Sequence, residues 1–229
     1  MSKRHPLIFV FIFFAFIFMA NKIPAQESAK IRYVAVGDSY TIGTGATLPE
    51  AWPTLLTKDL KAKGVNIDIV ANTAQGGWTT QNALDLEIPV FRFLKPNFGT
   101  LLIGTNDWVH GVDADTFRQQ LVKILDQMLA VLPQKNRLLI VTIPDFSFSP
   151  RGKEFSHGRN ISEGIAQFNK IIVEEAEKRS LSIVDIYPLS QKMGDDPSFF
   201  SDDGLHPSAK GYAQWEKVIL PAVESLLVK

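Results

Sequence analysis

Two kinds of apolar segment alternate along the chain from residue 31 onwards. Short runs rich in β-branched residues, which predict strands, cover residues 31–36, 66–71, 98–103, 137–143 and 182–186. Between them lie segments whose apolar residues recur at helical spacing. Five strands separated by helices predict one parallel sheet with helices on both faces, because each parallel connection must cross over the sheet.

The helical segments are predicted at residues 51–63, at 79–93, around Phe117 to Leu132, around Ile165 to Ala176, and from Ser208 onwards. Two of them contain a proline, which cannot donate a backbone hydrogen bond and crowds the preceding turn. We therefore expect Pro89 to bend or end the second helix and Pro221 to interrupt the last one.

Polar residues at helix starts support these boundaries. Asp113 or Asp115 can cap the third helix, and Asn160 with Glu163 forms a plausible capping box for the fourth. Residues 145–159 contain Pro and Gly and show no periodicity. A loop of that length is predicted to lie over the sheet and to carry function.

The first 25 residues have the layout of a secretory leader. Lys3 and Arg4 give a positive start, residues 7–20 are almost purely apolar, and small residues follow at Ala20 and Ala25. The apolar run is short for a membrane span, so cleavage is favoured over an uncleaved anchor. We expect a signal peptide at 1–25, one domain at 26–229, and a periplasmic or secreted protein without a stable membrane span.

Composition narrows the possible classes. The 229 residues are 45% apolar and carry no net charge, which suits a single globular domain with a packed core. No cysteine is present, so disulfides, thiolate metal sites and a lipidated N-terminal cysteine are excluded. Loss of the leader would leave a mildly acidic chain, which offers no electrostatic footprint for nucleic acid.

Four polar motifs follow predicted strands or precede the last helix. They are Gly37-Asp38-Ser39-Tyr40, the segment 72–77, Gly104-Thr105-Asn106-Asp107, and the segment 202–207. Ligands of open parallel sheets bind at the carboxyl ends of the strands, so the motifs are expected to converge there. Each motif alone could be an ordinary turn or helix cap. A common position at one sheet edge favours a catalytic site.

The last motif pairs an acid with a histidine. Asp203 stands three residues before His206, a spacing that lets the carboxylate fold back onto the ring within one turn. A carboxylate so placed orients the imidazole toward a nucleophilic hydroxyl, for which Ser39 is the candidate. Asn106 and a glycine of the second motif carry donors that could hold an oxyanion.

Together the four motifs resemble the conserved blocks of the SGNH hydrolases, also called the GDSL esterase/lipase family. The resemblance implies a flavodoxin-like three-layer α/β/α sandwich with strand order 2-1-3-4-5. It implies Ser39, Asp203 and His206 as catalytic residues, and Ser39, Gly77 and Asn106 as the oxyanion hole. Gly76 remains an alternative to Gly77, and Tyr40 stands where the family has Leu.

The resemblance predicts an exported serine esterase that cleaves a lipid ester, a simple ester or an O-acetylated carbohydrate without metal or organic cofactor. An O-acyltransferase, or a glycan- or lipid-binding module that lacks catalysis, remains an alternative. A GxSxG elbow, an HExxH metal motif and a phosphate-binding P-loop are all missing.

Aromatic residues after the strand ends could line the substrate pocket, or could equally be core. They are Tyr40, Trp78, Trp108 and Phe146. Phe146, Phe148 and Phe155 on the long loop could form a lid or could fold down onto the sheet. Neither the acyl length nor the oligomeric state can be inferred from the sequence.

Overall fold

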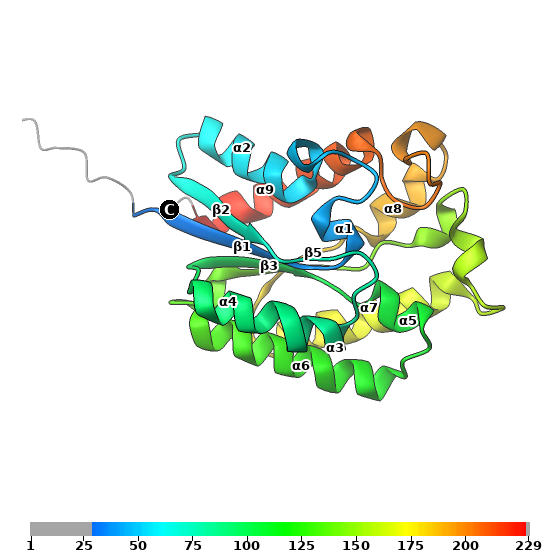
Figure 1. Cartoon of the computed structure of the whole chain (residues 1–229), viewed down its shortest axis with the longest axis horizontal. Helices are drawn as coiled ribbons and strands as arrows, with labels where there is room; N and C mark the ends of the chain where they lie inside the picture. Colours follow the sequence, from blue (N-terminus) through cyan, green and yellow to red (C-terminus); the bar gives the residue numbers. More distant parts are fainter. Residues whose placement is uncertain (1–28, 228–229) are drawn as a thin grey trace, which may run out of the picture.

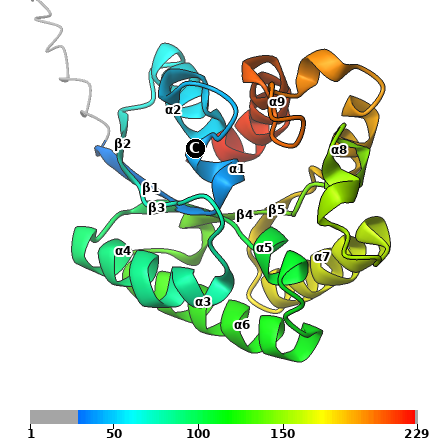
Figure 2. The same cartoon turned by 45° about the vertical axis from the view of Figure 1, so that its right-hand side comes forward.

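The computed structural model describes residues 29–227, and its centre is a parallel sheet of five strands. The strands are β1 (Ile31–Gly37), β2 (Ile67–Asn72), β3 (Phe98–Leu102), β4 (Leu138–Val141) and β5 (Ser182–Val184). Their order is β2-β1-β3-β4-β5, which confirms the predicted order (Figure 2). The predicted signal peptide lies outside the described residues.

Helices cover both faces of the sheet (Figure 1; Figure 2). Two helices, α2 (Trp52–Ala62) and α9 (Ala209–Leu227), pack on one face. The other face carries α4 (Ile88–Leu94), α6 (Ala114–Val131) and α7 (Ile161–Glu177). The three-layer prediction is confirmed. Within residues 29–227, no helix is long and apolar enough to span a bilayer.

The chain reverses its direction of winding at β1. It leaves β1 toward β2 on one side and later returns to β3 on the other, so β1 and β3 flank the switch point of the sheet. Both strands are almost wholly buried, and the Tyr33 hydroxyl is hydrogen-bonded to Thr100 Oγ1 at 2.8 Å between them. A crevice at such a switch point is where doubly wound sheets bind ligands.

The second predicted helix continues through its proline by changing geometry. It consists of α3 (Thr80–Asn82), a π-helical turn at Ala83–Glu87, and α4, which contains Pro89 near its start. A wider π turn accommodates the missing proline N–H without ending the helix. The turn also directs Glu87 into the protein interior, where it is fully buried.

The predicted interruption at Pro221 is wrong. Helix α9 runs through Pro221 to its end at Leu227. Pro221 is exposed, and so is Lys217, whose carbonyl loses its usual partner and can bond water instead. Buried Ile219 and Val223 on the opposite side hold the helix against the core.

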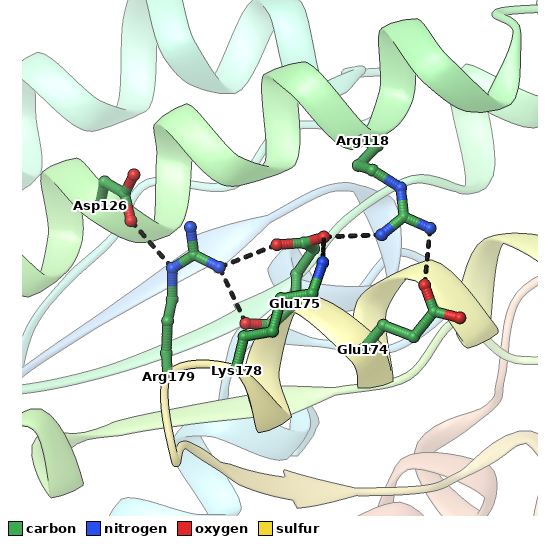
Figure 3. Close-up of polar contacts among 6 residues, drawn as sticks. All are labelled: Arg118, Asp126, Glu174, Glu175, Lys178 and Arg179. Atoms are coloured by element: carbon green, nitrogen blue, oxygen red, sulfur yellow. Dashed lines mark hydrogen bonds and ion pairs between the residues drawn. The ribbon is translucent and has the colours of Figure 1, made fainter.

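Helices α6 and α7 are joined by a cluster of charged side chains (Figure 3). Glu175 accepts from Arg118 at 2.6 Å, from Lys178 at 2.7 Å and from Arg179 at 2.9 Å. Burial alone would raise the pKa of Glu175, but these three cations lower it to about 2. The cluster joins the two helices, and none of its residues lines the cavity beside Ser39.

The predicted loop 145–159 is ordered by short turns and by anchored ends. It contains the 3-10 turns Phe146–Phe148 and Gly152–Phe155. The Asp145 N–H donates to Ser190 Oγ at 2.7 Å on α8 (Tyr187–Met193), and Asn160 caps α7 by accepting from the Glu163 N–H. The loop is therefore fixed above the sheet at both ends.

Candidate active site

Ser39 is held where β1 turns into a short helix. It is the first residue of α1 (Ser39–Ile42), directly after Asp38, whose Oδ1 accepts the Tyr40 N–H at 3.0 Å. A Cβ on Gly37 would lie 2.3 Å from the carbonyl oxygen of Leu102, so only glycine fits this close approach to β3. The hydroxyl of Ser39 thus projects from a rigid corner at the switch point.

His206 lies on a tight turn whose polar groups are satisfied locally. Asp203 Oδ1 accepts the N–H groups of Leu205 at 2.8 Å and His206 at 2.9 Å, and the hydroxyl of Ser201 at 2.8 Å. Gly204 has φ +68°, a left-handed conformation that closes the turn. The predicted pairing of an acid with a histidine three residues later therefore rests on a backbone that brings the two side chains together.

The chain of hydrogen bonds runs from Asp203 through His206 to Ser39. Asp203 Oδ2 lies 2.7 Å from His206 Nδ1, and His206 Nε2 lies 2.9 Å from Ser39 Oγ. An ionised carboxylate only accepts, so Nδ1 carries the ring proton and Nε2 of the neutral ring accepts from the serine hydroxyl. Residues from opposite ends of the chain form this arrangement, and Asp202 has no part in it.

Asp203 stays ionised over the whole neutral range. Partial burial would raise its pKa, but the N–H of Leu205, the His206 ring and N–H, and the Ser201 hydroxyl lower it to about 2. A charged Asp203 both fixes the ring tautomer and stabilises an imidazolium that forms beside it.

Three groups that can donate to an oxyanion surround the Ser39 hydroxyl. The side chain of Asn106 lines the same cavity, and its Nδ2 donates one hydrogen to the carbonyl of Trp78 at 2.9 Å, which leaves the second free to turn inward. The Ser39 N–H begins a helix and has no intrahelical partner. Gly76 and Gly77 both line the cavity, and a Cβ on Gly76 would lie 3.9 Å from that of Ser39. Either glycine could therefore supply the third donor.

Two buried carboxyl groups lie beneath the Ser39 corner. Burial raises the pKa of Glu87 to about 8 and that of Asp38 to about 7, and the charge of Asp38 adds to the shift of Glu87. Glu87 Oε2 lies 3.0 Å from the Gly37 N–H and 2.8 Å from the Thr73 hydroxyl. At neutral pH Glu87 is therefore largely a protonated acid.

The hydrogen bonds of Thr73 agree with that protonation. Its hydroxyl lies 3.1 Å from the carbonyl of Ala35 as well as 2.8 Å from Glu87. A hydroxyl has one proton and a carbonyl only accepts, so both contacts are satisfied when Glu87 donates to Thr73 and Thr73 donates to Ala35. Nothing in the sequence distinguished Glu87 from a solvent-facing helical glutamate.

The cavity beside Ser39 has a volume of about 360 Å³. Of the four aromatic residues predicted to line it, Tyr40 and Phe146 do. Trp78 and Trp108 do not, which corrects that prediction: Trp108 is buried behind Phe146, and Trp78 contributes its carbonyl rather than its ring. The remaining walls are Thr44, Thr105, Phe155 and Leu205, together with the glycines and the residues already described.

The structure combines a three-layer α/β/α fold with a Ser-His-Asp triad, which lies at the switch point of the sheet. These two features together define a class of α/β/α proteins. Comparison with known proteins agrees. Residues 35–214 match the GDSL-like Lipase/Acylhydrolase family. The chain belongs to this family.

Individual relatives are more distant. The chain is 30% identical over 159 residues to a multidomain esterase of Ruminococcus flavefaciens, a match that covers 66% of the chain and 19% of that protein. It is 24% identical to an acetylxylan esterase of Xylanibacter ruminicola, covering 89% of the chain and 45% of that protein. The chain thus spans less than half the length of both.

A crystal structure of TesA shows the same fold. It superposes with a TM-score of 0.69 at 21% identity, over 86% of this chain and 99% of that one. At this identity the likeness concerns the fold alone.

Proposed function

We propose that the protein hydrolyses carboxylic esters through an acyl-enzyme on Ser39. The observation that carries the proposal is the unbroken hydrogen-bonded series from Asp203 through His206 to Ser39, open to a cavity. Family membership supports the same reaction class. A nucleophile, its base and the residue that orients the base are the three parts that acyl transfer to serine requires.

In this mechanism His206 Nε2 takes the proton of Ser39 as Oγ attacks the ester carbonyl. The oxyanion that forms is met by the Ser39 N–H, the Asn106 amide and a glycine N–H at 76 or 77. His206 then gives its proton to the leaving alcohol, which breaks the ester bond and leaves Ser39 acylated. Water, deprotonated by the same ring, releases the acid and restores Ser39.

The substrate class we favour is a short acyl group carried on a carbohydrate. One relative is named an acetylxylan esterase. Phe146, Phe155 and Leu205 give the cavity wall apolar surface for an acyl methyl or a sugar face.

We also propose that residues 1–25 direct export and are cleaved, so that the protein acts in the periplasm or outside the cell. The test is the mass of the protein recovered from those compartments. A mature chain that retains residues 1–25 would contradict cleavage.

A fluorophosphonate probe tests the activity directly. Labelling should occur at Ser39 and vanish in Ser39→Ala, as located by peptide mass spectrometry. A series of p-nitrophenyl esters from acetate upwards, run beside acetylated xylo-oligosaccharides, should give the highest kcat/KM for acetyl groups. A protein that neither reacts with the probe nor hydrolyses any ester would be a binding module instead.

A further inference from the structure

A second, open cavity lies beside the one at Ser39. Its volume is about 620 Å³, and its walls are Val109, His110, Gly111, His157 and Arg159. Three of the five wall residues carry a side chain that is cationic or can become so, and no acidic side chain is part of the wall. The mechanism proposed above uses none of these residues.

The same two segments of chain form walls in both cavities. The first is α5 (Thr105–Val109) with the residues that follow it: Asn106 faces the Ser39 cavity, and His110 faces the second. The other is the loop 145–159, in which Phe155 faces the Ser39 cavity and Arg159 the second. A substrate that enters along the boundary of these segments meets both cavities.

Packed aromatic side chains connect the walls of the two cavities. The ring centroids of Phe146, a wall of the Ser39 cavity, and Trp108 are 5.9 Å apart. Arg159 Cζ lies 4.1 Å from the centroid of the Trp108 ring. One aromatic side chain, Trp108, therefore contacts both a wall residue of the Ser39 cavity and Arg159 of the second cavity.

Arg159 is fixed in place but its charge is not neutralised. It stacks on buried Trp108, and it donates to the carbonyls of Val109 at 2.8 Å and Ser156 at 3.4 Å. Both partners are neutral. Across residues 29–227 no carboxylate lies within ion-pair distance of Arg159, whereas Arg151 pairs with one carboxylate and Arg118 and Arg179 with two each. A guanidinium held in this way is preorganised for an anion.

The backbone beside Arg159 is held in an uncommon conformation. His157 has φ +48° and the following Gly158 has φ +76°, so two consecutive residues are left-handed. For a residue other than glycine this conformation costs about 1 kcal/mol or more and is retained where the surroundings enforce it. Here it places the His157 side chain on the cavity wall opposite α5.

From this arrangement we infer that the second cavity binds a carboxylate of the substrate, so that the preferred substrate is an acylated glycan bearing an acidic sugar next to the esterified one. The inference rests on the proposed esterase function. An open depression whose wall carries Arg159 and two histidines suits a sugar carboxylate, because Arg pairs with carboxylates through two parallel hydrogen bonds.

The test compares two forms of one substrate. An acetylated xylo-oligosaccharide with a glucuronic acid branch is assayed beside the same molecule after carboxyl reduction, which keeps its shape and removes its charge. We expect kcat/KM to be about tenfold higher for the acidic form, the size expected of one charge-assisted hydrogen bond. The preference should shrink as salt screens the pair.

Variants locate the effect. In Arg159→Gln the ratio of kcat/KM for the acidic form to that for the reduced form should fall close to one. In His157→Asn the same ratio should fall by about threefold. Asparagine is chosen there because it tolerates positive φ. Arg92→Gln, an exposed arginine of α4 outside both cavities, is the matched control and should keep the full preference. Thermal melts check that each variant is folded. A preference that survives both Arg159→Gln and His157→Asn would overturn the inference.

Binding separates this inference from the proposed function. Ser39→Ala protein, which cannot turn over an ester by the proposed route, is titrated calorimetrically with each oligosaccharide. Tighter binding of the acidic form supports the inference whatever the hydrolysis assays show. Equal binding and equal kcat/KM, with p-nitrophenyl acetate still hydrolysed, would refute the carboxylate site and leave the esterase assignment standing.

Discussion

The turn that carries Ser39 and the turn that carries His206 are held in different ways. The Ser39 turn, residues 37–41, is buried, and its contacts come from distant parts of the chain: Glu87 bonds the Gly37 N–H, and Asn72 Nδ2 donates to the Thr41 carbonyl at 2.8 Å. The His206 turn, residues 203–206, is partly exposed and is closed mainly by its own residues through Asp203.

The difference shows where precision comes from in this site. The sheet fixes the position of the nucleophile, because Gly37 packs so closely against β3 that a Cβ there would collide with the Leu102 carbonyl. The base depends on one carboxylate, since Asp203 both closes the turn and orients the ring. Added side-chain bulk should therefore cost more stability at the first turn than at the second, whereas loss of the Ser39 hydroxyl or of the Asp203 charge should act mainly on turnover.

The largest expected effect belongs to Ser39→Ala. Removal of the nucleophile should lower kcat by roughly 10⁶-fold, the scale seen when a triad serine is lost. Because the side chain only fills the edge of a cavity, the thermal midpoint should change little. Steady-state hydrolysis of p-nitrophenyl acetate and calorimetric melting measure the two quantities, and substantial residual turnover would rule Ser39 out.

Asp203→Asn should lower kcat by about 10⁴-fold, because an amide no longer fixes the Nδ1–H tautomer of His206. Asp202→Asn is the matched control: this neighbour makes no contact with the ring, and its rates should stay within about twofold of the parent, as for surface changes. Equal effects at the two positions would show that the turn and not the carboxylate matters.

Asn106→Ala should lower kcat by about 10² to 10³-fold with a smaller change in KM, as expected for loss of one oxyanion donor. A change confined to KM would make Asn106 a substrate contact rather than an oxyanion donor.

Alanine substitutions at one glycine of each turn compare the two turns by their effect on the free energy of unfolding. Gly37→Ala forces a methyl group against the Leu102 carbonyl and should cost about 3 kcal/mol. Gly204→Ala imposes a left-handed alanine that meets the flexible Arg151 side chain, and should cost about 1–2 kcal/mol. Urea denaturation measures both, and a reversed order would mean that the His206 turn is the more constrained of the two.

The smallest effect concerns the proton on Glu87. Since its folded pKa is raised to about 8, the folded state binds more protons than the unfolded chain from about pH 4.5 to pH 8, and stability falls as pH rises through that window. Glu87→Gln, which cannot ionise, should lose less stability between pH 5 and 9 than the parent. Parallel pH curves of the thermal midpoint would show that Glu87 is not the group responsible.

Much of this architecture could be predicted because it depends on local pattern. Runs of β-branched residues gave the strands, and the Asp203 to His206 spacing gave the pair that meets in the structure. Apart from the contact of Ser39 with His206, which the motifs marked, contacts between distant segments could not be predicted. The burial of Glu87 depends on a π turn ahead of Pro89, and the displacement of Trp108 from the cavity depends on its packing over Gly164, where a Cβ would lie 1.7 Å from Nε1.

At Pro221 the local sequence gave a wrong prediction. Local sequence predicts a break, yet buried side chains on the core side of α9 outweigh the loss of one hydrogen bond on its exposed side. Whether a proline interrupts a helix thus depends on tertiary packing, which the local sequence pattern does not reveal.

The anchored loop 145–159 has a practical consequence. Asp145 and Asn160 fix its ends on α8 and α7, while the Ser39 nucleophile and the His206 base lie on other segments. Exchange of this loop for one of the same length and end residues, with Arg151 kept because its N–H donates to the Gly204 carbonyl at 2.8 Å, should redirect the enzyme to new leaving groups and keep its reaction. Asp145 and Asn160 therefore define the boundaries of a loop that can be exchanged in a library of variants.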